Sequence, residues 1–266
     1  MDDDRIHRVV SDDGTEIAGR VRGNGPPLVI VHGGLGDGNP DTSFMLPFLV
    51  EHFTCYLIST RGRGVSAEHA DHSRERQYED VAAFVEGIGE QVSVFGHSSG
   101  AVWVLGGAAR AAAACRAIAL YEPALPVTRP VMSEEAYARY CSAVTEGRLT
   151  DAFWVATDNV IVPTDEERAL FSIPGVAELS APLLPAGVRE LPELNRPTDT
   201  ESLKKLTMPV LLLEGTRSGN HFKDALRSLD ETLDHARVVS ITGAGHLGPM
   251  THAEAVAQEL VSFFKD

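Results

Sequence analysis

The feature that most constrains this chain is a Gly-x-Ser-x-Gly turn at residues 96–100, within the run VSVFGHSSG. A short apolar run leads into the turn, and the helix-like segment AVWVL follows it. A serine on a sharp strand-to-helix turn is held in a strained backbone conformation, which lifts its hydroxyl clear of a sheet. Glycine stands at 96 and 100 because side chains there would meet the neighbouring backbone. The pattern selects Ser98, and not Ser99, as the candidate nucleophile.

The flanking segments give this motif its weight, because a chain with 24 glycines contains short glycine patterns by chance. Short apolar runs alternate with amphipathic segments along most of the chain, as expected when strands alternate with helices. This alternation predicts an α/β protein with a mostly parallel sheet that helices cover on both faces. A hairpin is expected at 5–22, strands at 27–31, 53–60, 92–97, 117–121, 209–213 and 236–241, and helices at 42–52, 78–88, 99–115, 222–233 and 253–264.

The alternation stops between residues 126 and 207. That stretch is rich in proline and contains several helix-like pieces, but it has no clear strand signal. We interpret it as a helical insertion over one edge of the sheet. The chain then consists of a core, residues 1–125 and 208–266, and an inserted segment, residues 126–207. A length of 266 residues suits one large α/β domain of this kind.

Charge and composition exclude several classes of partner. The formal net charge is −15, whereas nucleic-acid binding needs a basic surface. The same charge disfavours an anionic membrane surface, and no apolar run has the length of a membrane span. No basic-then-apolar leader opens the sequence. Three widely spaced cysteines, Cys55, Cys115 and Cys141, favour reduced packing residues over disulfides or a metal site. We therefore expect a cytoplasmic protein with a small-molecule substrate. The sequence gives no basis for predicting its oligomeric state.

A serine hydroxyl needs a general base, and the base needs an acid to orient it. Among ten histidines, His246 has the best position, because it follows the last predicted strand in the glycine-rich run GAGHLG at 243–248. Such a loop can bend back over the strand ends, where ligands bind in open α/β sheets. His32 and His97 are expected to pack within the glycine turns that they flank. The remaining histidines, His72 among them, are expected on the surface.

Attack on a carbonyl produces an oxyanion, which backbone N–H groups can stabilise. One donor is expected from Ser99, the residue after the nucleophile. The other is expected from the loop HGGLG at 32–36, whose glycines allow the backbone to approach a substrate closely. Gly34 is the first choice in that loop and Leu35 is the second.

Taken together, these pieces resemble the α/β-hydrolase superfamily, and the resemblance extends over nearly the whole chain. The matching motifs, in order, are HGG at 32–34, RGRGVS at 61–66, the turn at 96–100, YEP at 121–123 and GAGH at 243–246. The resemblance implies an α/β-hydrolase fold with an eight-stranded sheet, a helical cap over the site and a triad in the order serine, acid, histidine. It implies no cofactor.

The acid is the point at which the chain departs from this family. The family usually places an aspartate after the strand that follows the cap, whereas this chain has Ser218 there. A serine cannot carry the negative charge that stabilises an imidazolium. The best substitute is Glu122, before the cap, because a glutamate can reach His246 from a neighbouring strand and some α/β-hydrolases place their acid here. Asp224 in the following helix and Glu214 in the preceding strand are the alternatives.

The 126–207 segment carries several aromatic side chains and many leucines. In this superfamily the cap usually forms the wall of the substrate pocket, and an apolar wall suggests a small to medium hydrophobic substrate. Phe153 and Trp154 are candidate pocket residues in this segment. Leu35 and Met250 are further candidates near the proposed catalytic residues.

The prediction is a serine hydrolase of a carboxylic ester or lactone, with Ser98 as nucleophile, His246 as base and Glu122 as acid, and without cofactor or metal. The same triad could cleave thioesters, amides or carbon–carbon bonds, or serve a perhydrolase-type reaction. Dehalogenases and epoxide hydrolases are disfavoured, because they resemble this fold but use an aspartate at the position of Ser98. The alternative from another class is a ligand-binding protein that keeps the fold without turnover.

Overall fold

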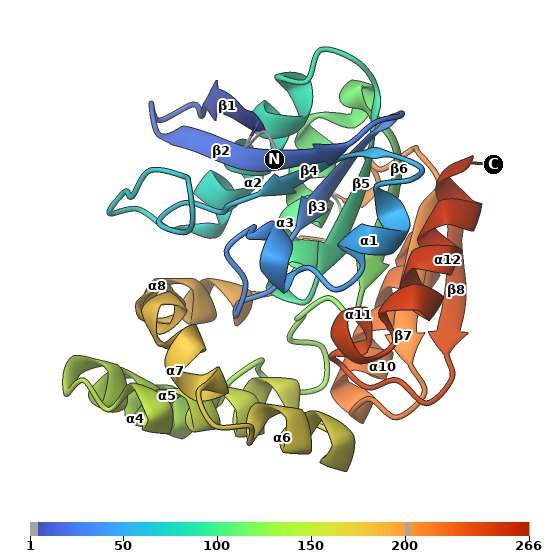
Figure 1. Cartoon of the computed structure of the whole chain (residues 1–266). Helices are drawn as coiled ribbons and strands as arrows, with labels where there is room; N and C mark the ends of the chain where they lie inside the picture. The colour runs from blue at the N-terminus through green and yellow to red at the C-terminus, as the bar shows by residue number, and fades with distance from the viewer. Residues whose placement is uncertain (1–4, 200–202, 266) are drawn as a thin grey trace.

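The computed structural model of the protein describes residues 5–199 and 203–265. Its centre is one eight-stranded sheet with the strand order β1-β2-β4-β3-β5-β6-β7-β8 (Figure 1). The strands are β1 (Arg5–Val10), β2 (Glu16–Gly23), β3 (Pro27–Val31), β4 (Thr54–Ile58), β5 (Val92–His97), β6 (Cys115–Tyr121), β7 (Val210–Gly215) and β8 (Ala236–Ile241).

The sheet is antiparallel at one edge and parallel elsewhere. β1 and β2 form the predicted hairpin, and β2 pairs antiparallel with β4. Every other pair of neighbouring strands is parallel. Because β3 lies between β4 and β5, the strand order reverses there, and the loops after β3 and β5 leave the sheet side by side. Ligands bind at such a reversal point in open α/β sheets. The 32–36 loop and Ser98 both lie there.

Helices flank the sheet, and a further group of helices lies between β6 and β7. Those beside the sheet are α1 (Leu46–Leu49), α2 (Arg74–Glu86), α3 (Ser99–Arg110), α10 (Asn220–Thr232), α11 (Gly248–Thr251) and α12 (Ala253–Lys265). Those between β6 and β7 are α4 (Glu134–Thr145), α5 (Leu149–Ala156), α6 (Asp165–Phe171), α7 (Val176–Ser180) and α8 (Leu184–Leu194). Short 3-10 turns occur at Pro40–Thr42, Ala112–Ala114 and Ala181–Leu183, and a π turn occurs at Thr157–Ile161.

Alternate side chains of the central strands point to opposite faces of the sheet and build two hydrophobic cores. In β3, Val29 and Val31 belong to the larger core, whereas Leu28 and Ile30 belong to the smaller one. Residues of α2, α3 and α10 complete the larger core, and residues of α1 and α12 complete the smaller one. Helices therefore cover both faces of the sheet, as the alternation of apolar and amphipathic segments predicted.

Two helices are shorter than expected. The helix expected at 42–52 is confined to α1, because Pro47 lacks a backbone N–H and is tolerated only in the first turn of a helix. A helix that began at residue 42 would have Pro47 in its interior. The helix expected to reach residue 115 ends at Arg110, since β6 already begins at Cys115 and a 3-10 turn is needed to change direction.

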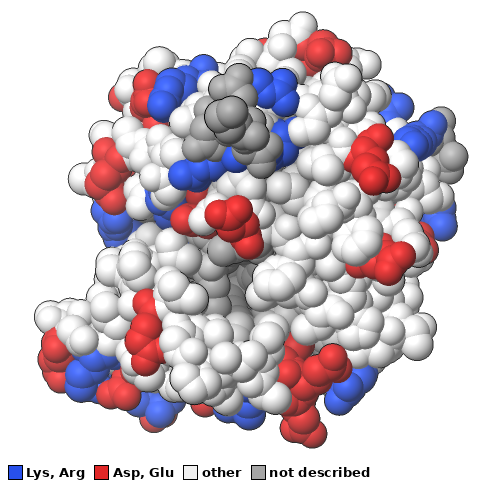
Figure 2. All heavy atoms as spheres, in the orientation of Figure 1, with Lys and Arg blue, Asp and Glu red and all other residues white. Residues whose placement is uncertain are grey.

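Helices α4–α8, which we call the helical layer, lie beyond the carboxyl ends of the parallel strands (Figure 1). Among the described residues of the 126–207 segment there is no strand, as the sequence predicted. The molecular surface is hollowed between the helical layer and the part that contains the sheet (Figure 2). Acidic and basic side chains are interspersed on this face of the molecule (Figure 2).

Within residues 5–199 and 203–265, no single helix is long and apolar enough to cross a membrane. The helical segments Asp165–Phe171 and Val176–Leu194 have that length and apolar composition only when taken together, and they are bent by 81° relative to each other. All three cysteines are free, and Cys55 and Cys115 are buried.

Candidate active site

β5 ends at His97 and α3 begins at Ser99, so Ser98 lies on a turn between a strand and a helix, as the motif predicted. Its φ is 55°, a left-handed value that is uncommon for a residue other than glycine and typical of strain at functional sites. The Ser98 N–H donates to the Tyr121 carbonyl at 3.0 Å, and the Ser98 carbonyl accepts from the Ala124 N–H at 3.2 Å. The end of β6 therefore holds the turn in this conformation.

We expect Gly100→Ala to destabilise the protein by more than about 3 kcal/mol. The added carbon would lie 2.3 Å from the His32 carbonyl oxygen, and the sheet holds that backbone in place. Gly34→Ala is the matched control, because a carbon there would lie 3.8 Å from the Ser99 hydroxyl, an ordinary contact. It should change the free energy of unfolding by less than about 1 kcal/mol. Urea unfolding measures both, and equal stabilities would contradict the role of Gly100.

His246 and Glu122 are in direct contact. His246 Nδ1 and Glu122 Oε2 lie 2.8 Å apart, and the two side chains are 2% and 0% exposed. The other carboxylate oxygen, Oε1, accepts the Gly215 N–H at 2.7 Å. Glu122 has a φ of 45°, so left-handed strain occurs at the ends of both β5 and β6. Among the described residues no hydrogen bond joins Ser98 Oγ to His246, a contact that often tightens only when substrate binds.

Burial controls the protonation of this pair. Removal from water disfavours both charged forms, so it raises the pKa of Glu122 to about 7 and lowers the pKa of His246 to about 4. The Ser218 hydroxyl and the Gly215 amide oppose the shift in the pKa of Glu122, and the Glu167 carboxylate opposes that of His246. Above pH 7 the pair therefore holds a carboxylate against a neutral imidazole. Its Nδ1–H donates to the carboxylate, which leaves Nε2 free to accept a proton.

Three contacts hold His246 and its loop from the core of the protein. The ring of Phe222 stacks on the imidazole with centroids 3.9 Å apart and an angle of 5° between the planes. The Tyr121 hydroxyl donates to the Gly245 carbonyl at 2.7 Å. His97 Nε2 donates to the His246 carbonyl at 2.9 Å, which fits the packing role expected for His97. The stacking by Phe222 was not predicted, because its position in an amphipathic helix indicates only a core residue.

The helical layer also contacts this loop. Glu167 of α6 is buried and accepts the Leu247 N–H, next to His246, at 2.5 Å. Its second oxygen accepts the Thr164 N–H at 2.9 Å in a capping box at the start of α6. Sequence reasoning missed Glu167. The run TDEE at 164–167 has the form of a helix start, but nothing in it indicates a contact with a loop 80 residues away.

The two alternative acids have other partners. Asp224 in α10 accepts hydrogen bonds from Thr128 and from Arg227, each at 3.0 Å. Glu214 in β7 accepts the Ser240 hydroxyl at 2.7 Å. Neither carboxylate is bonded to the histidine in the described part of the chain, whereas the glutamate at the end of β6 is.

The expected oxyanion donors lie beside the nucleophile. A carbon added at Gly33 would lie 3.2 Å from Ser98 Cβ, so the loop after β3 runs alongside the nucleophile. The N–H groups of Gly34, Leu35 and Ser99 have no hydrogen-bond acceptor among the described residues. For Ser99 this follows from its place at the start of α3, because the first N–H groups of a helix have no intrahelical partner.

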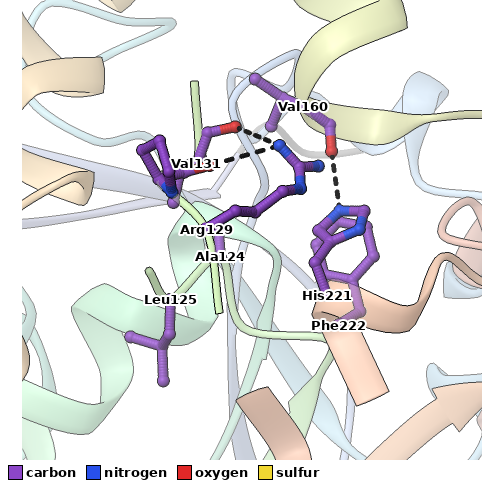
Figure 3. A pocket seen from close by; sticks show the side chains of 8 residues that line it. Ala124, Leu125, Arg129, Val131, Val160, His221 and Phe222 are labelled. Atoms are coloured by element: carbon purple, nitrogen blue, oxygen red, sulfur yellow. Dashed lines mark hydrogen bonds between the residues drawn. The ribbon is translucent and has the colours of Figure 1, made fainter. Parts of the chain in front are cut away.

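Phe222, whose ring stacks on His246, also lines a small apolar pocket. Figure 3 shows this pocket with Phe222 and His221 on one side of it. Its volume is about 10 Å³, enough for one water molecule. An open groove of about 520 Å³ shares Arg129 and His221 with it. The pocket is lined by Ala124, Leu125, Arg129, Pro130, Val131, Val160, His221 and Phe222.

None of the four predicted pocket residues lines either of these two cavities. Leu35, Trp154 and Met250 are partly buried and pack against the larger core, and their place in a substrate pocket stays a prediction. Phe153 is fully buried, and its ring meets those of Trp154 and Phe171 edge-on. This burial favours packing within the helical layer for Phe153. Among the described residues, no group of three or more His, Cys, Asp or Glu side chains is arranged to hold a metal ion.

Comparisons with known proteins agree with this fold. Residues 28–259 match the model of the alpha/beta hydrolase family. An alpha/beta hydrolase from Sphaerobacter thermophilus DSM 20745 superposes with a TM-score of 0.81 and 30% identity, over 97% of this chain and 100% of the other. An esterase from Rhodococcus sp. ECU1013 (TM-score 0.77, 22% identity) and a thermophilic esterase from Thermogutta terrifontis (0.74, 23%) each superpose over 98% of both chains, a likeness of fold alone. A search of curated proteins found no match.

Proposed function

This chain belongs to the alpha/beta hydrolase family, which matches it over residues 28–259, and from that premise we propose that it is a serine hydrolase of carboxylic esters or lactones. The observation that carries the proposal is the buried contact of 2.8 Å between Glu122 and His246, next to the loop of the strained Ser98. A nucleophile, a base and an orienting acid, placed at the carboxyl ends of parallel strands of one sheet, are the parts that acyl transfer needs.

In the proposed reaction, Ser98 Oγ attacks the substrate carbonyl carbon while His246 Nε2 removes the hydroxyl proton. Glu122 accepts the Nδ1–H, which holds the imidazole in the productive tautomer, and its charge stabilises the imidazolium. The imidazolium then gives its proton to the leaving alkoxide as the carbon–oxygen bond breaks, and an acyl-enzyme remains. Water activated by His246 hydrolyses the acyl-enzyme, and the proton returns to Ser98.

We propose that the N–H groups of Gly34 and Ser99 bind the oxyanion of the tetrahedral intermediate. Both groups lack an acceptor within the described part of the protein and lie next to Ser98. Donors that are fixed before the reaction need no reorganisation while the charge develops, which makes them effective in a buried site. The N–H of Leu35 is the second candidate.

For the substrate we propose a small to medium, largely apolar acyl or alcohol group. The wall next to the base consists mainly of apolar side chains, including Leu125, Val131 and Phe222. The helical layer lies beyond the strand ends, and we propose that it acts as a cap that limits access of water to the site. The Rhodococcus and Thermogutta proteins that share this fold are esterases, and we propose esters as the first substrates to test.

The value of kcat/KM for an uncharged ester is expected to fall about tenfold per pH unit below about pH 7 and to level off above it. Burial raises the pKa of Glu122 to about 7, so the buried pair takes up a proton as the pH falls through that value. The protonated pair lacks the carboxylate charge that stabilises the imidazolium, so His246 becomes an ineffective base. A pH–rate profile with an uncharged substrate tests this. A profile that stays flat down to pH 5 would contradict it.

The experiment that tests the proposed function is a hydrolysis screen on esters and lactones of graded size, with Ser98→Ala as the control. We expect turnover of at least one small or medium apolar ester or lactone by the natural protein and none above background by the variant. If only thioesters, amides or carbon–carbon bonds are cleaved, the proposed reaction class is wrong, whereas the proposed catalytic residues are retained. Activity that survives in Ser98→Ala would contradict the proposed mechanism.

A further inference from the structure

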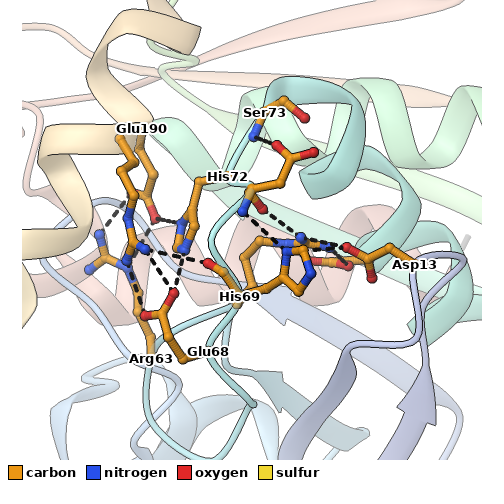
Figure 4. A network of polar contacts seen from close by, with 11 residues as sticks. Asp13, Arg63, Glu68, His69, His72, Ser73 and Glu190 are labelled. Carbon is orange, nitrogen blue, oxygen red and sulfur yellow. Dashed lines mark hydrogen bonds and ion pairs between the residues drawn. The ribbon is translucent and has the colours of Figure 1, made fainter.

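A buried ion pair connects the helical layer to the loop after β4 (Figure 4). Arg63 Nη2 donates to Glu190 Oε2 of α8 at 2.8 Å, and Arg63 Nε donates to Glu190 Oε1 at 3.3 Å. The two side chains are only 2% and 4% exposed. A buried charge pair is costly to desolvate unless its remaining donors are also satisfied. The partners of the third guanidinium nitrogen, Nη1, therefore show how the remaining donors of Arg63 are satisfied.

Arg63 Nη1 donates to two carbonyl oxygens of the loop after β3, Gly34 O at 2.8 Å and Gly36 O at 3.2 Å. In a trans peptide the C=O and the following N–H point in opposite directions. A guanidinium that holds the Gly34 carbonyl on one side of the loop therefore directs the Leu35 N–H to the other side. The guanidinium thereby sets the peptide unit that follows Gly34.

The peptide unit that precedes Gly34 is held in a matching way. The Gly33 carbonyl accepts from His32 Nδ1 and from the Gly36 N–H, each at 2.9 Å. His32 Nε2 accepts the Thr60 N–H at 3.2 Å, so the ring proton lies on Nδ1. Both peptide units around Gly34 are thus fixed by their carbonyls. The free N–H groups of this loop belong to the same two units.

A second ion pair joins the same elements at the surface. Arg189 of α8 donates to Glu68 at 2.9 Å, and these two side chains are 37% and 56% exposed. His72, which was expected on the surface, is buried, and its Nε2 donates to Glu68 at 2.9 Å (Figure 4). An exposed pair of this kind contributes little to stability. The exposed pair of Arg189 and Glu68 is therefore a control for the buried pair of Arg63 and Glu190, because both pairs link α8 to the loop after β4.

We propose that Arg63 is a positioning residue for the oxyanion hole, and that Glu190 makes this positioning depend on the helical layer. The inference rests on the proposed function, because an oxyanion hole matters only where acyl chemistry occurs at Ser98. Without Arg63 the peptide between Gly34 and Leu35 is free to rotate, so the Leu35 N–H, the second candidate donor, is no longer held in place, and the backbone that carries the Gly34 N–H loses one of its two anchors. A rotated peptide would turn a carbonyl, instead of an N–H, toward the developing negative charge.

The test uses Arg63→Gln and Glu190→Gln, with Arg189→Gln as the matched control. For each variant, kcat and KM are measured on an ester from the screen. The affinity for a trifluoromethyl ketone is also measured, because Ser98 Oγ adds to the carbonyl carbon of the ketone and the carbonyl oxygen becomes an oxyanion. The affinity for the neutral alcohol product is measured as well. Active-site titration corrects each value for the folded fraction.

We expect Arg63→Gln to lower kcat roughly 30- to 100-fold and to weaken ketone binding by a similar factor, with KM and alcohol affinity within about twofold of the natural protein. Glu190→Gln should act in the same direction by about 5- to 10-fold, since its amide oxygen still accepts from Arg63. Arg189→Gln should change each quantity by less than about twofold.

Unchanged ketone affinity in folded Arg63→Gln would overturn the inference, as would an equal loss of ketone and alcohol affinity, which indicates general damage to the site. If Arg63→Gln does not fold, the same comparison with Glu190→Gln decides. A natural protein without turnover overturns the proposed function together with this inference. If the natural protein is active and the variants have the same kcat and the same affinity for the ketone, this inference alone is overturned.

Discussion

Glu122→Gln is expected to lower kcat about 10³- to 10⁴-fold, with little change in KM. The glutamine removes the negative charge that stabilises the His246 imidazolium. It also offers an amide NH₂ in place of one carboxylate oxygen. Because Oε1 is occupied by the Gly215 N–H at 2.7 Å, the NH₂ would face Nδ1 and favour the wrong imidazole tautomer. Steady-state kinetics on an ester from the screen measure the effect.

Asp224→Asn is the control for this prediction, because that carboxylate pairs with Thr128 and Arg227 and should change kcat by less than about threefold. A rescue experiment adds a second test. The Ser218 hydroxyl is buried and has no hydrogen-bond partner among the described residues, and it occupies the position at which the resembled family usually has its acid. Ser218→Asp in the Glu122→Gln background should recover at least about tenfold of the lost kcat. A large loss in Asp224→Asn with none in Glu122→Gln would refute the assignment of the acid.

Ser98→Ala is expected to lower kcat by about 10⁴- to 10⁶-fold while product binding is retained. The side chain supplies the nucleophile, and no acyl-enzyme can form without it. The backbone contacts of this turn, to Tyr121 and Ala124, use only the Ser98 N–H and carbonyl, so they persist in the variant. Turnover is measured with the screened ester, and product affinity by calorimetry. A kcat within tenfold of that of the natural protein would place the nucleophile elsewhere.

Much of the fold could be predicted because its signals are local. β3 and β5 are short apolar runs that end in glycine-rich turns, and their side chains alternate between two cores. The place of Ser98 on a strand-to-helix turn could be predicted because the turn motif is local. The contact between Glu122 and His246 could be predicted because Ser218 stands where the resembled family usually has a carboxylate. The catalytic roles of these residues stay predictions. The short α1 was not predicted, because the effect of Pro47 depends on where the helix begins.

The supporting contacts could not be predicted because they join residues that are far apart in the sequence. Glu190 bonds to Arg63 across 127 positions, and Glu167 bonds to the Leu247 N–H across 80. In each case a carboxylate on an otherwise ordinary helix is buried by the docking of the helical layer onto the core. His72 was placed on the surface for the same reason, since its burial depends on α8.

The most direct test of the account is labelling with an active-site-directed fluorophosphonate, followed by mass analysis of the digested protein. The probe reports an activated serine whatever the natural substrate is. The account predicts one probe per chain, attached to Ser98, no label in Ser98→Ala, and labelling slowed by at least about a hundredfold in Glu122→Gln. A natural protein that takes up no probe at Ser98 would contradict the hydrolase account and favour a ligand-binding protein with this fold.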